Sequence, residues 1–319
     1  MYNSVASETV SQDIGVIQGS KCGPLFFDIY SNDMNYLLPN DDKIFYADDT
    51  CLVFRGLDIA TIMEGINSTL AKVADWCKFN KLALNPAKSV YMLITGKKEF
   101  NEPSIFIEAD AVNRVESFCY LGMNIDEKMK YQCHVDVMRK KFSQLAGMTF
   151  RIKKYLNLGA AKKLYFAFVY SIMTYCIAAW GGVMLETASC VSVFASHTRI
   201  VRNLFSRFQH DDQCTFKSMK ILKLVDVYKL SAAAYMFKVM KFDMYGSLHE
   251  GLRLEYPSHR YPTSLRADLI LPFQRKNAIR ISHKYQFVNI WNTVPCSIKS
   301  LNKLSTFKRK YTEHLLSLY

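Results

Sequence analysis

Apolar residues repeat at helical spacing in two stretches of the first third of the chain. Residues 15–38 open with a glycine-rich turn, and after Pro24, which suits the first turn of a helix, the apolar residues fall near one face. A second stripe follows Asp58, a candidate helix cap, and ends near Phe79. The first stripe comprises Leu25, Ile29, Tyr30, Met34 and Leu37, and the second comprises Ile62, Ile66, Leu70, Val73 and Trp76.

Short apolar runs of strand type lie between and after these helices. Residues 44–47 and 50–54 flank Asp48 and Asp49, and they predict a β-hairpin with both acids at its tip. Residues 88–95 predict a strand, and residues 104–123 predict a further hairpin.

From about residue 131 the pattern becomes helical and basic. We predict helices over 131–156, 160–180, 187–208 and 226–244. The expected fold class is therefore α+β, with a mixed strand-and-helix region over 1–125 followed by a mostly helical region over 126–319.

The charge distribution supports that boundary. Residues 1–125 carry 10 Lys and Arg against 16 Asp and Glu, whereas residues 126–319 carry 31 against 12. A net charge of −6 is thus followed by a net charge of +19. A surface this basic favours nucleic acid as a partner, although a basic domain without such a role has the same composition.

The cysteines and the N-terminal sequence bear on the compartment. The nine cysteines are scattered, without a CxxC pair or a zinc-type cluster, so we interpret them as free thiols of an intracellular protein. The first 15 residues have neither a basic cap nor an apolar core, and we expect no signal peptide.

One apolar segment, residues 164–185, is long enough to cross a membrane because it carries no charge over 22 positions. It also contains Tyr, Ser, Thr and a Gly-Gly break, and its aromatic residues are spread throughout. A helix buried between other helices has the same pattern. We expect the buried helix and no membrane span.

The adjacent acids Asp48 and Asp49 are the strongest candidate for chemistry. A tight turn holds both carboxylates at one edge of the predicted hairpin, and hard oxygen ligands of this kind suit Mg²⁺ or Mn²⁺. An acidic hairpin tip exposed to water is the alternative, and for an Asp-Asp pair alone it is the commoner case.

The surrounding motifs change that balance. GVIQGSKCGPLFF precedes the YADD box at Tyr46–Asp49, and WCKFNKLALNPAKSVYML and FCYLG follow it. In this order and spacing they resemble the palm motifs of reverse transcriptases, most closely those of non-LTR, LINE-type and jockey-like retrotransposons. The first motif departs from the family pattern at Ile17 and at Lys21-Cys22. Segments in the helical region, including KKLYFAFVYSIMTYCIAAWGG, resemble the region that follows the polymerase in these elements, so the resemblance covers most of the chain.

This resemblance implies a role for each matching residue. Asp48 would bind the catalytic metal ions directly, and Asp49 would assist nearby. Lys88 would protonate or neutralise the leaving pyrophosphate, with a solvated surface lysine as the alternative. The residues implied in nucleotide and template binding are Gln18, Gly19, Ser20, Gly23, Pro24, Tyr46 and Ala47, and those implied in gripping the primer end are Tyr120, Leu121 and Gly122. These residues also have purely structural explanations. Gly19 and Gly23 would then serve an ordinary turn, and Tyr120–Gly122 would belong to the core of a sheet.

The resemblance also implies partners and a location. The partners would be an RNA template, a DNA primer, deoxynucleoside triphosphates and Mg²⁺ or Mn²⁺, and the chain would act in the nucleus and cytoplasm; the oligomeric state is not indicated. The partial palm would span 1–125, and the thumb and C-terminal region 126–319.

The family also uses a further aspartate upstream of the GxxQG loop, on a strand of DxxxAFD type, together with a fingers region. Asp13 is too close to Gly15 to replace that aspartate. We therefore expect a truncated polymerase that is inactive by itself. The alternative is a nucleic-acid-binding remnant without chemistry, to which Arg139–Lys141 and Lys308–Lys310 would contribute phosphate contacts.

Overall fold

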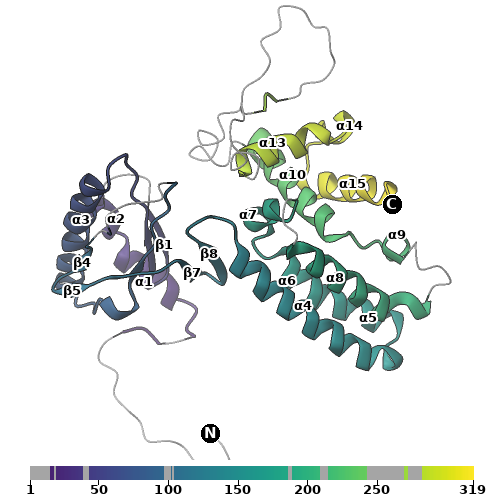
Figure 1. Ribbon diagram of the computed structural model, residues 1–319, viewed down its shortest axis with the longest axis horizontal. Helices are drawn as coiled ribbons and strands as arrows, with labels where there is room; N and C mark the ends of the chain where they lie inside the picture. The colour runs from purple at the N-terminus through teal and green to yellow at the C-terminus, as the bar shows by residue number, and fades with distance from the viewer. Residues whose placement is uncertain are drawn as a thin grey trace, which may run out of the picture. The chain divides into compact units, whose positions relative to one another are not determined.

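The chain forms two compact units, Met1–Glu116 and Ser117–Tyr319. The computed structural model confirms the α+β class, since short strands and helices make up the first unit and helices dominate the second (Figure 1). The residues that the structure describes are 15–17, 19–38, 43–96, 102, 104–185, 189–208, 215–242, 269–271 and 282–319.

The first unit begins with the predicted helix and hairpin. Helix α1 (Gly23–Ser31) is followed by the short α2 (Met34–Leu37) and by strands β1 (Lys43–Tyr46) and β2 (Asp49–Leu52). The apolar stripe of α1, however, is not buried as a helix of a closed core would be. Leu25 is 58% exposed and Ile29 is 66% exposed, and Gly23 is the buried residue of that helix.

Helix α3 (Ile59–Phe79) follows the sequence prediction closely. The carboxylate of Asp58 accepts a hydrogen bond from the backbone N–H of Thr61 at 3.0 Å, which caps the helix as expected. The stripe of α3 packs into two small clusters. One contains Met34, Leu38, Val73, Trp76 and Cys77; in the other, Ile66 and Leu70 lie against Ile105, Ile107 and Val112.

The strands of the described chain form two-stranded sheets rather than one larger sheet. Residues 88–95, predicted as one strand, contain only the two-residue β3 at Val90–Tyr91. Lys88 instead ends a 3₁₀ turn over Pro86–Lys88, in which the Asn85 side chain accepts a hydrogen bond from Lys88 N. The predicted hairpin over 104–123 is divided among several pairings. Strand β3 (Val90–Tyr91) pairs in parallel with β6 (Asn113–Arg114), β4 (Phe106–Ile107) pairs with β5 (Asp110–Ala111), and β7 (Ser117–Tyr120) pairs with β8 (Met123–Asp126).

The second unit starts earlier than the charge pattern indicated. The division lies after Glu116 rather than near residue 125, because the β7–β8 hairpin packs against helix α4. The helices of this unit are α4 (Gln132–Ile152), α5 (Leu158–Leu164), α6 (Ser171–Thr174), α7 (Ile177–Trp180), α8 (Ser189–Phe205), α9 (Thr215–Met219), α10 (Leu224–Phe242), α13 (His283–Thr293), α14 (Cys296–Lys299) and α15 (Leu304–Ser317), with short helical turns at Lys153–Tyr155, Gly181–Leu185 and Ser206–Phe208.

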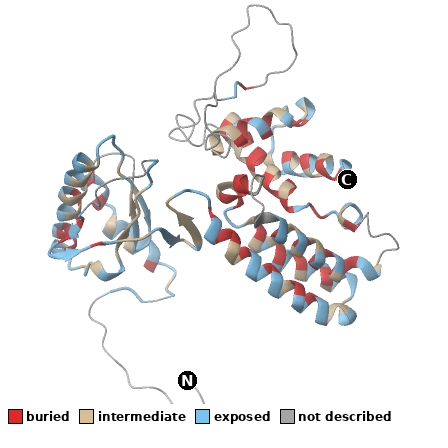
Figure 2. Ribbon diagram, in the orientation of Figure 1, coloured by how far each residue is buried: buried red, intermediate tan, exposed pale blue. Residues whose placement is uncertain are grey.

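Most of the core lies in this second unit. Helices α4 and α8 run side by side, and buried positions recur along both (Figures 1 and 2). Phe142, Ile200 and Phe205 are fully buried there. The one carboxylate buried in the described part of α10, Asp226, accepts hydrogen bonds from Tyr319 Oη at 2.7 Å and Lys229 Nζ at 3.0 Å, so its charge is compensated.

The predicted helix over 160–180 is interrupted twice. Its middle, Tyr165–Tyr170, is π-helical, and the chain turns between α6 and α7, where Cys176 has a φ of 49°. Tyr165, Val169 and Met173 are buried within the unit. In the described part of the chain no single helix has the length and hydropathy of a membrane span, whereas the pair Leu158–Thr174 and Ile177–Val183, bent by 52°, meets both criteria only when taken together.

Candidate functional site

The β1–β2 hairpin presents the acidic pair as the sequence predicted. Tyr46 pairs directly with Asp49, so Ala47 and Asp48 form the two-residue turn. Ala47 has a φ of 53°, a left-handed conformation that is unfavourable for a residue with a Cβ. Asp48 and Asp49 are both exposed. The turn therefore holds two carboxylates next to each other at the end of a short, well-registered hairpin.

The electrostatic surroundings leave both acids available. Among the described residues, no ion pair joins Asp48 or Asp49 to a cation, and no cluster of three or more His, Cys, Asp or Glu side chains forms a metal site. Exposed carboxylates are suitable donors for a hard divalent cation. The pair fits such a cation as part of a ligand set, and two carboxylates fill only part of the coordination sphere that Mg²⁺ or Mn²⁺ requires.

The loop before α1 is held by its own backbone and one hydroxyl. Ser20 N donates to Ile17 O at 3.1 Å, and Gly23 N donates to Ser20 Oγ at 3.0 Å. Gly19 has a φ of 79°, and a Cβ on Gly23 would lie 2.7 Å from Ser20 Oγ. Both glycines are thus required by the turn itself. Pro24 lies in the first turn of α1, and Gln18 is outside the described residues.

Two contacts that the sequence did not reveal hold α1 and α2 against α3. Trp76 Nε1 donates to Asp33 Oδ1 at 3.1 Å, and Tyr30 Oη donates to the carbonyl of Asn80. Trp76 was predicted as part of the apolar stripe and as the first residue of the WCKFNKLALNPAKSVYML motif, without a polar partner. An indole N–H that becomes buried needs an acceptor, and that requirement is the signal that could have indicated a polar partner.

Lys88 ends the 3₁₀ turn that follows α3. Its backbone N–H is held by Asn85 and its side chain is exposed. The Asn-Pro-x-Lys sequence thus forms a capped turn that presents the lysine to solvent. Lys88 and the acidic pair lie in the same unit, and no hydrogen bond or ion pair among its described residues connects them.

Tyr120, Leu121 and Gly122 belong to the second unit. Leu121 and Gly122 form the two-residue turn of the β7–β8 hairpin, with φ values of 46° and 78°. Positive φ at both positions is the geometry of a tight hairpin turn, and Gly suits it. Tyr175 Oη donates to the carbonyl of Leu121, and Trp180 Nε1 donates to the carbonyl of Tyr175 at 2.9 Å, so the turn is anchored on the helical unit.

These motifs match a known family of proteins. Residues 2–125 match the family model described as reverse transcriptase (RNA-dependent DNA polymerase). The match includes the loop, the hairpin with Asp48 and Asp49, Lys88 and the Tyr120–Gly122 turn. No solved structure matches the chain.

Among the similar proteins are three polymerases from Drosophila melanogaster. A probable RNA-directed DNA polymerase from transposon X-element is 28% identical over 148 residues, which are 44% of this chain and 16% of that protein. A probable RNA-directed DNA polymerase from transposon BS is 27% identical, covering 52% of this chain and 20% of that protein. The RNA-directed DNA polymerase from mobile element jockey is 22% identical, covering 52% and 19%.

These alignments cover about half of the chain, less than the motifs of the helical region led us to expect. They span a fifth or less of each relative. Residues 2–125 match the reverse transcriptase family model, and the chain is similar over about half of its length to the polymerases of non-LTR retrotransposons.

Proposed function

We propose that this chain contributes part of the palm, and the helical region beyond it, of an RNA-directed DNA polymerase that copies a retrotransposon RNA. The observation that carries the proposal is the β1–β2 turn, which lies within the matched region and holds Asp48 and Asp49 exposed and without a cationic partner among the described residues. RNA template, DNA primer and deoxynucleoside triphosphates are the proposed partners.

In this reaction the 3′ hydroxyl of the primer attacks the α-phosphate of the nucleotide, and pyrophosphate leaves. Asp48 would hold Mg²⁺ or Mn²⁺ directly and Asp49 would complete the acidic edge. Bound divalent ions supply charge stabilisation at the attacking and leaving oxygens. Lys88 is exposed and would neutralise the charge that develops on pyrophosphate.

The remaining residues of the proposal position the substrates. Gln18, Gly19 and Ser20 would contact the incoming nucleotide and the template. Gly23 and Pro24 would fix the start of α1. Tyr46 and Ala47 would lie beside the metal ligands. The Tyr120–Gly122 turn would hold the primer end, and its anchoring on Tyr175 supplies the rigidity that this role needs.

We also propose that synthesis requires at least one carboxylate in addition to Asp48 and Asp49. A two-metal transfer depends on a fixed coordination geometry, and two adjacent carboxylates leave a bridging position to be filled. The chain alone is therefore expected to bind a divalent cation weakly and to extend a primer at no measurable rate.

The decisive experiment combines metal binding with primer extension. Mn²⁺ binding, followed by the relaxation of solvent water protons, is expected to weaken in Asp48→Asn by fivefold or more and to stay unchanged in Asp110→Asn, an exposed aspartate on another hairpin of the same unit. Equal Mn²⁺ binding in both variants would remove Asp48 from the metal site. Extension of a primed RNA by the wild-type chain that is abolished in Asp48→Asn would support the polymerase and refute the need for a further carboxylate.

A second candidate function, nucleic-acid binding without chemistry, is favoured by the charge of the helical region. Residues 126–319 have a net charge of +19. Affinity for nucleic acid held by phosphate contacts falls steeply with salt. Binding by the chain that is insensitive to salt would exclude this candidate.

A further inference from the structure

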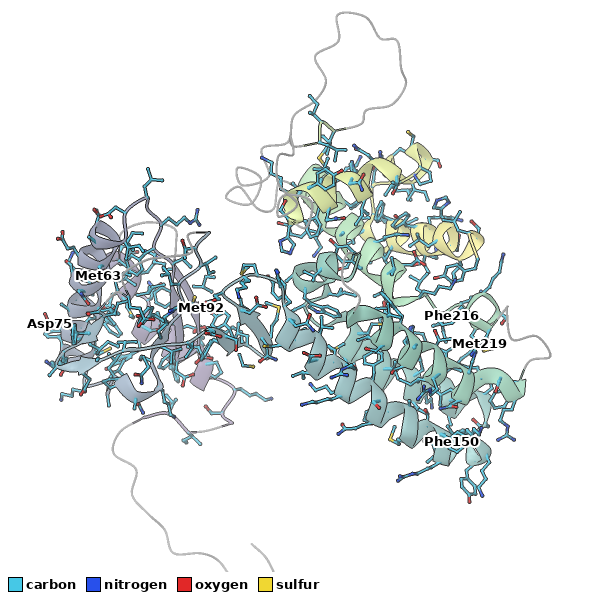
Figure 3. All side chains as sticks on the ribbon, viewed as in Figure 1. Met63, Asp75, Met92, Phe150, Phe216 and Met219 are labelled. Atoms are coloured by element: carbon cyan, nitrogen blue, oxygen red, sulfur yellow. The ribbon has the colours of Figure 1, made fainter. Side chains whose placement is uncertain are left out.

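The far end of helix α4 carries cations and aromatic rings together. This tip consists of Phe150 and Arg151 on α4, Lys153, Lys154 and Tyr155 in the turn that follows, and Arg207 after α8. Phe150 is labelled in Figure 3 at this end of the helix. A shallow hollow along α4, lined by Ser143, Gln144, Gly147, Met148, Arg151 and Ile152, adjoins the tip at Arg151.

The cations of the tip are not neutralised by nearby acids. Residues 137–210 contain eleven Lys and Arg and a single acid, Glu186. None of the described carboxylates forms an ion pair with Arg151, Lys153, Lys154 or Arg207. A local excess of positive charge of this kind attracts a polyanion.

The backbone of the tip is held in place by hydrogen bonds from α8 and the turn after it. The guanidinium of Arg207 donates to the carbonyls of Lys153 and Lys154 at 2.9 and 2.7 Å, which satisfies backbone groups at the end of α4. One turn earlier on each helix, Asn203 Nδ2 donates to Ala146 O at 3.0 Å and to Thr149 Oγ1 at 3.2 Å. A backbone held in one conformation loses little further entropy when a ligand binds.

Two aromatic side chains beside these cations are exposed to solvent. Phe150 is 58% exposed and Tyr155 is 77% exposed. Lys153 Nζ lies 4.3 Å from the centre of the Phe150 ring, and Lys154 Nζ lies 4.9 Å from that of Tyr155. Exposed rings flanked by cations offer bases a stacking surface and phosphates a counter-charge.

We propose that this basic-aromatic tip binds single-stranded nucleic acid, with bases stacked on Phe150 and Tyr155 and phosphates held by Arg151, Lys153 and Lys154. The proposal rests on the proposed function for its class of partner, and it assigns that partner a surface outside the matched family region. A duplex keeps its bases stacked on one another, so it would use the cations but not the rings.

The aromatic part is tested by fluorescence anisotropy with labelled single strands of RNA and of DNA, about 12 nucleotides long. Phe150→Ala and Tyr155→Ala are each expected to weaken binding roughly 5- to 150-fold, with no change in the salt slope. Tyr155→Phe keeps the ring and is expected to bind like the wild type. Phe168→Ala, which removes a ring 55% exposed elsewhere in the same unit, is the control and should change nothing.

The cationic part is tested by the double variant Lys153→Gln/Lys154→Gln, in which the salt slope is expected to fall in magnitude by about 1.4. The matched control is Lys241→Gln/Lys303→Gln, two exposed lysines of the same unit, one on α10 and one at the residue before α15. Circular dichroism of each variant establishes that the helices are intact.

Three results would overturn the proposal: unchanged affinity in both ring variants, tighter binding to a matched duplex than to the single strands, or binding only to vesicles that contain phosphatidylserine. A stronger effect for RNA than for DNA, or the reverse, identifies which strand the tip prefers. The proposed function is tested through Asp48 and metal binding, in the other unit. Failure of the tip would therefore be distinguishable from failure of the polymerase assignment.

Discussion

At the scale of single residues, the interior of the helical unit contains an uncharged histidine. His197 is 2% exposed, and its Nε2 lies 3.0 Å from Tyr165 Oη. Burial lowers the pKa of His197 from 6.5 to about 4. Rings of Phe142 and Phe216 lie around it, at centroid distances of 6.2 and 5.6 Å. The folded state therefore holds this histidine neutral where an unfolded chain would protonate it.

This difference predicts a loss of stability in acid. Above pH 6.5 His197 is neutral in both states; between pH 6.5 and about 4 the unfolded state takes up the extra proton, so the free energy of unfolding falls as the pH is lowered. The full loss is about 3 kcal/mol. His197→Gln removes the titrating group and should flatten the dependence measured by urea unfolding at each pH. The pKa of His134 is also lowered by burial, so a smaller slope should persist, and an unchanged slope would contradict the assignment.

In the candidate site, some features of single residues were predictable from the sequence and others were not. Asp48 lies at a hairpin tip as predicted, because strand alternation and a two-residue turn are local properties of the sequence. Asp33 as the partner of the Trp76 indole was not predictable, since the two residues are 43 positions apart and the motif that begins at Trp76 does not include Asp33. The structure also groups Tyr120 with the helical unit, which depends on packing between distant segments and not on local pattern.

At the scale of elements, apolar periodicity predicted α3 well and the segment after residue 158 poorly. In both, apolar residues recur every three or four positions. A π-helical turn over Tyr165–Tyr170 and a left-handed Cys176 change the backbone without interrupting that repeat, so the pattern cannot reveal them. The compact units divide after Glu116, whereas the charge pattern changes near residue 125, where the family match also ends. The β7–β8 hairpin carries little charge and its packing on α4 decides its membership.

The packing of the α7 region against α10 predicts a large effect of a small substitution. Gly181 has an ordinary φ of −66°, but a Cβ there would overlap the ring of Tyr228, which is fully buried. Gly181→Ala is expected to lower the free energy of unfolding by about 1–3 kcal/mol, because the ring has no free space to move into. Thermal unfolding monitored by circular dichroism measures the change.

Gly147 on α4 provides the matched control for this substitution. It is exposed and helical, and a Cβ there would meet nothing within 4 Å. Gly147→Ala should raise the free energy of unfolding by roughly 0.5–1 kcal/mol through helix propensity. Equal effects of the two substitutions would mean that the Gly181–Tyr228 contact does not determine the packing of α7.

At the scale of the whole molecule, the two units differ in how completely they bury their apolar residues. The second unit has one continuous core, whereas the first has two small clusters. Along α1, Leu25, Phe26 and Ile29 are each more than half exposed. On β1, Ile44 and Tyr46 are exposed as well. Apolar surface that is open to water at this density favours association between molecules.

We therefore expect the purified chain to self-associate through α1 and to bind a hydrophobic dye in its folded state. The double variant Leu25→Glu/Ile29→Lys replaces two apolar residues one helical turn apart with a favourable ion pair. It should lower dye fluorescence and shift sedimentation toward smaller species, with helicity unchanged. Leu57→Glu, at a residue that is 97% exposed outside α1, is the control and should leave both signals as they are. If the control were as effective as the double variant, exposed apolar side chains in general, and not the α1 surface, would govern association.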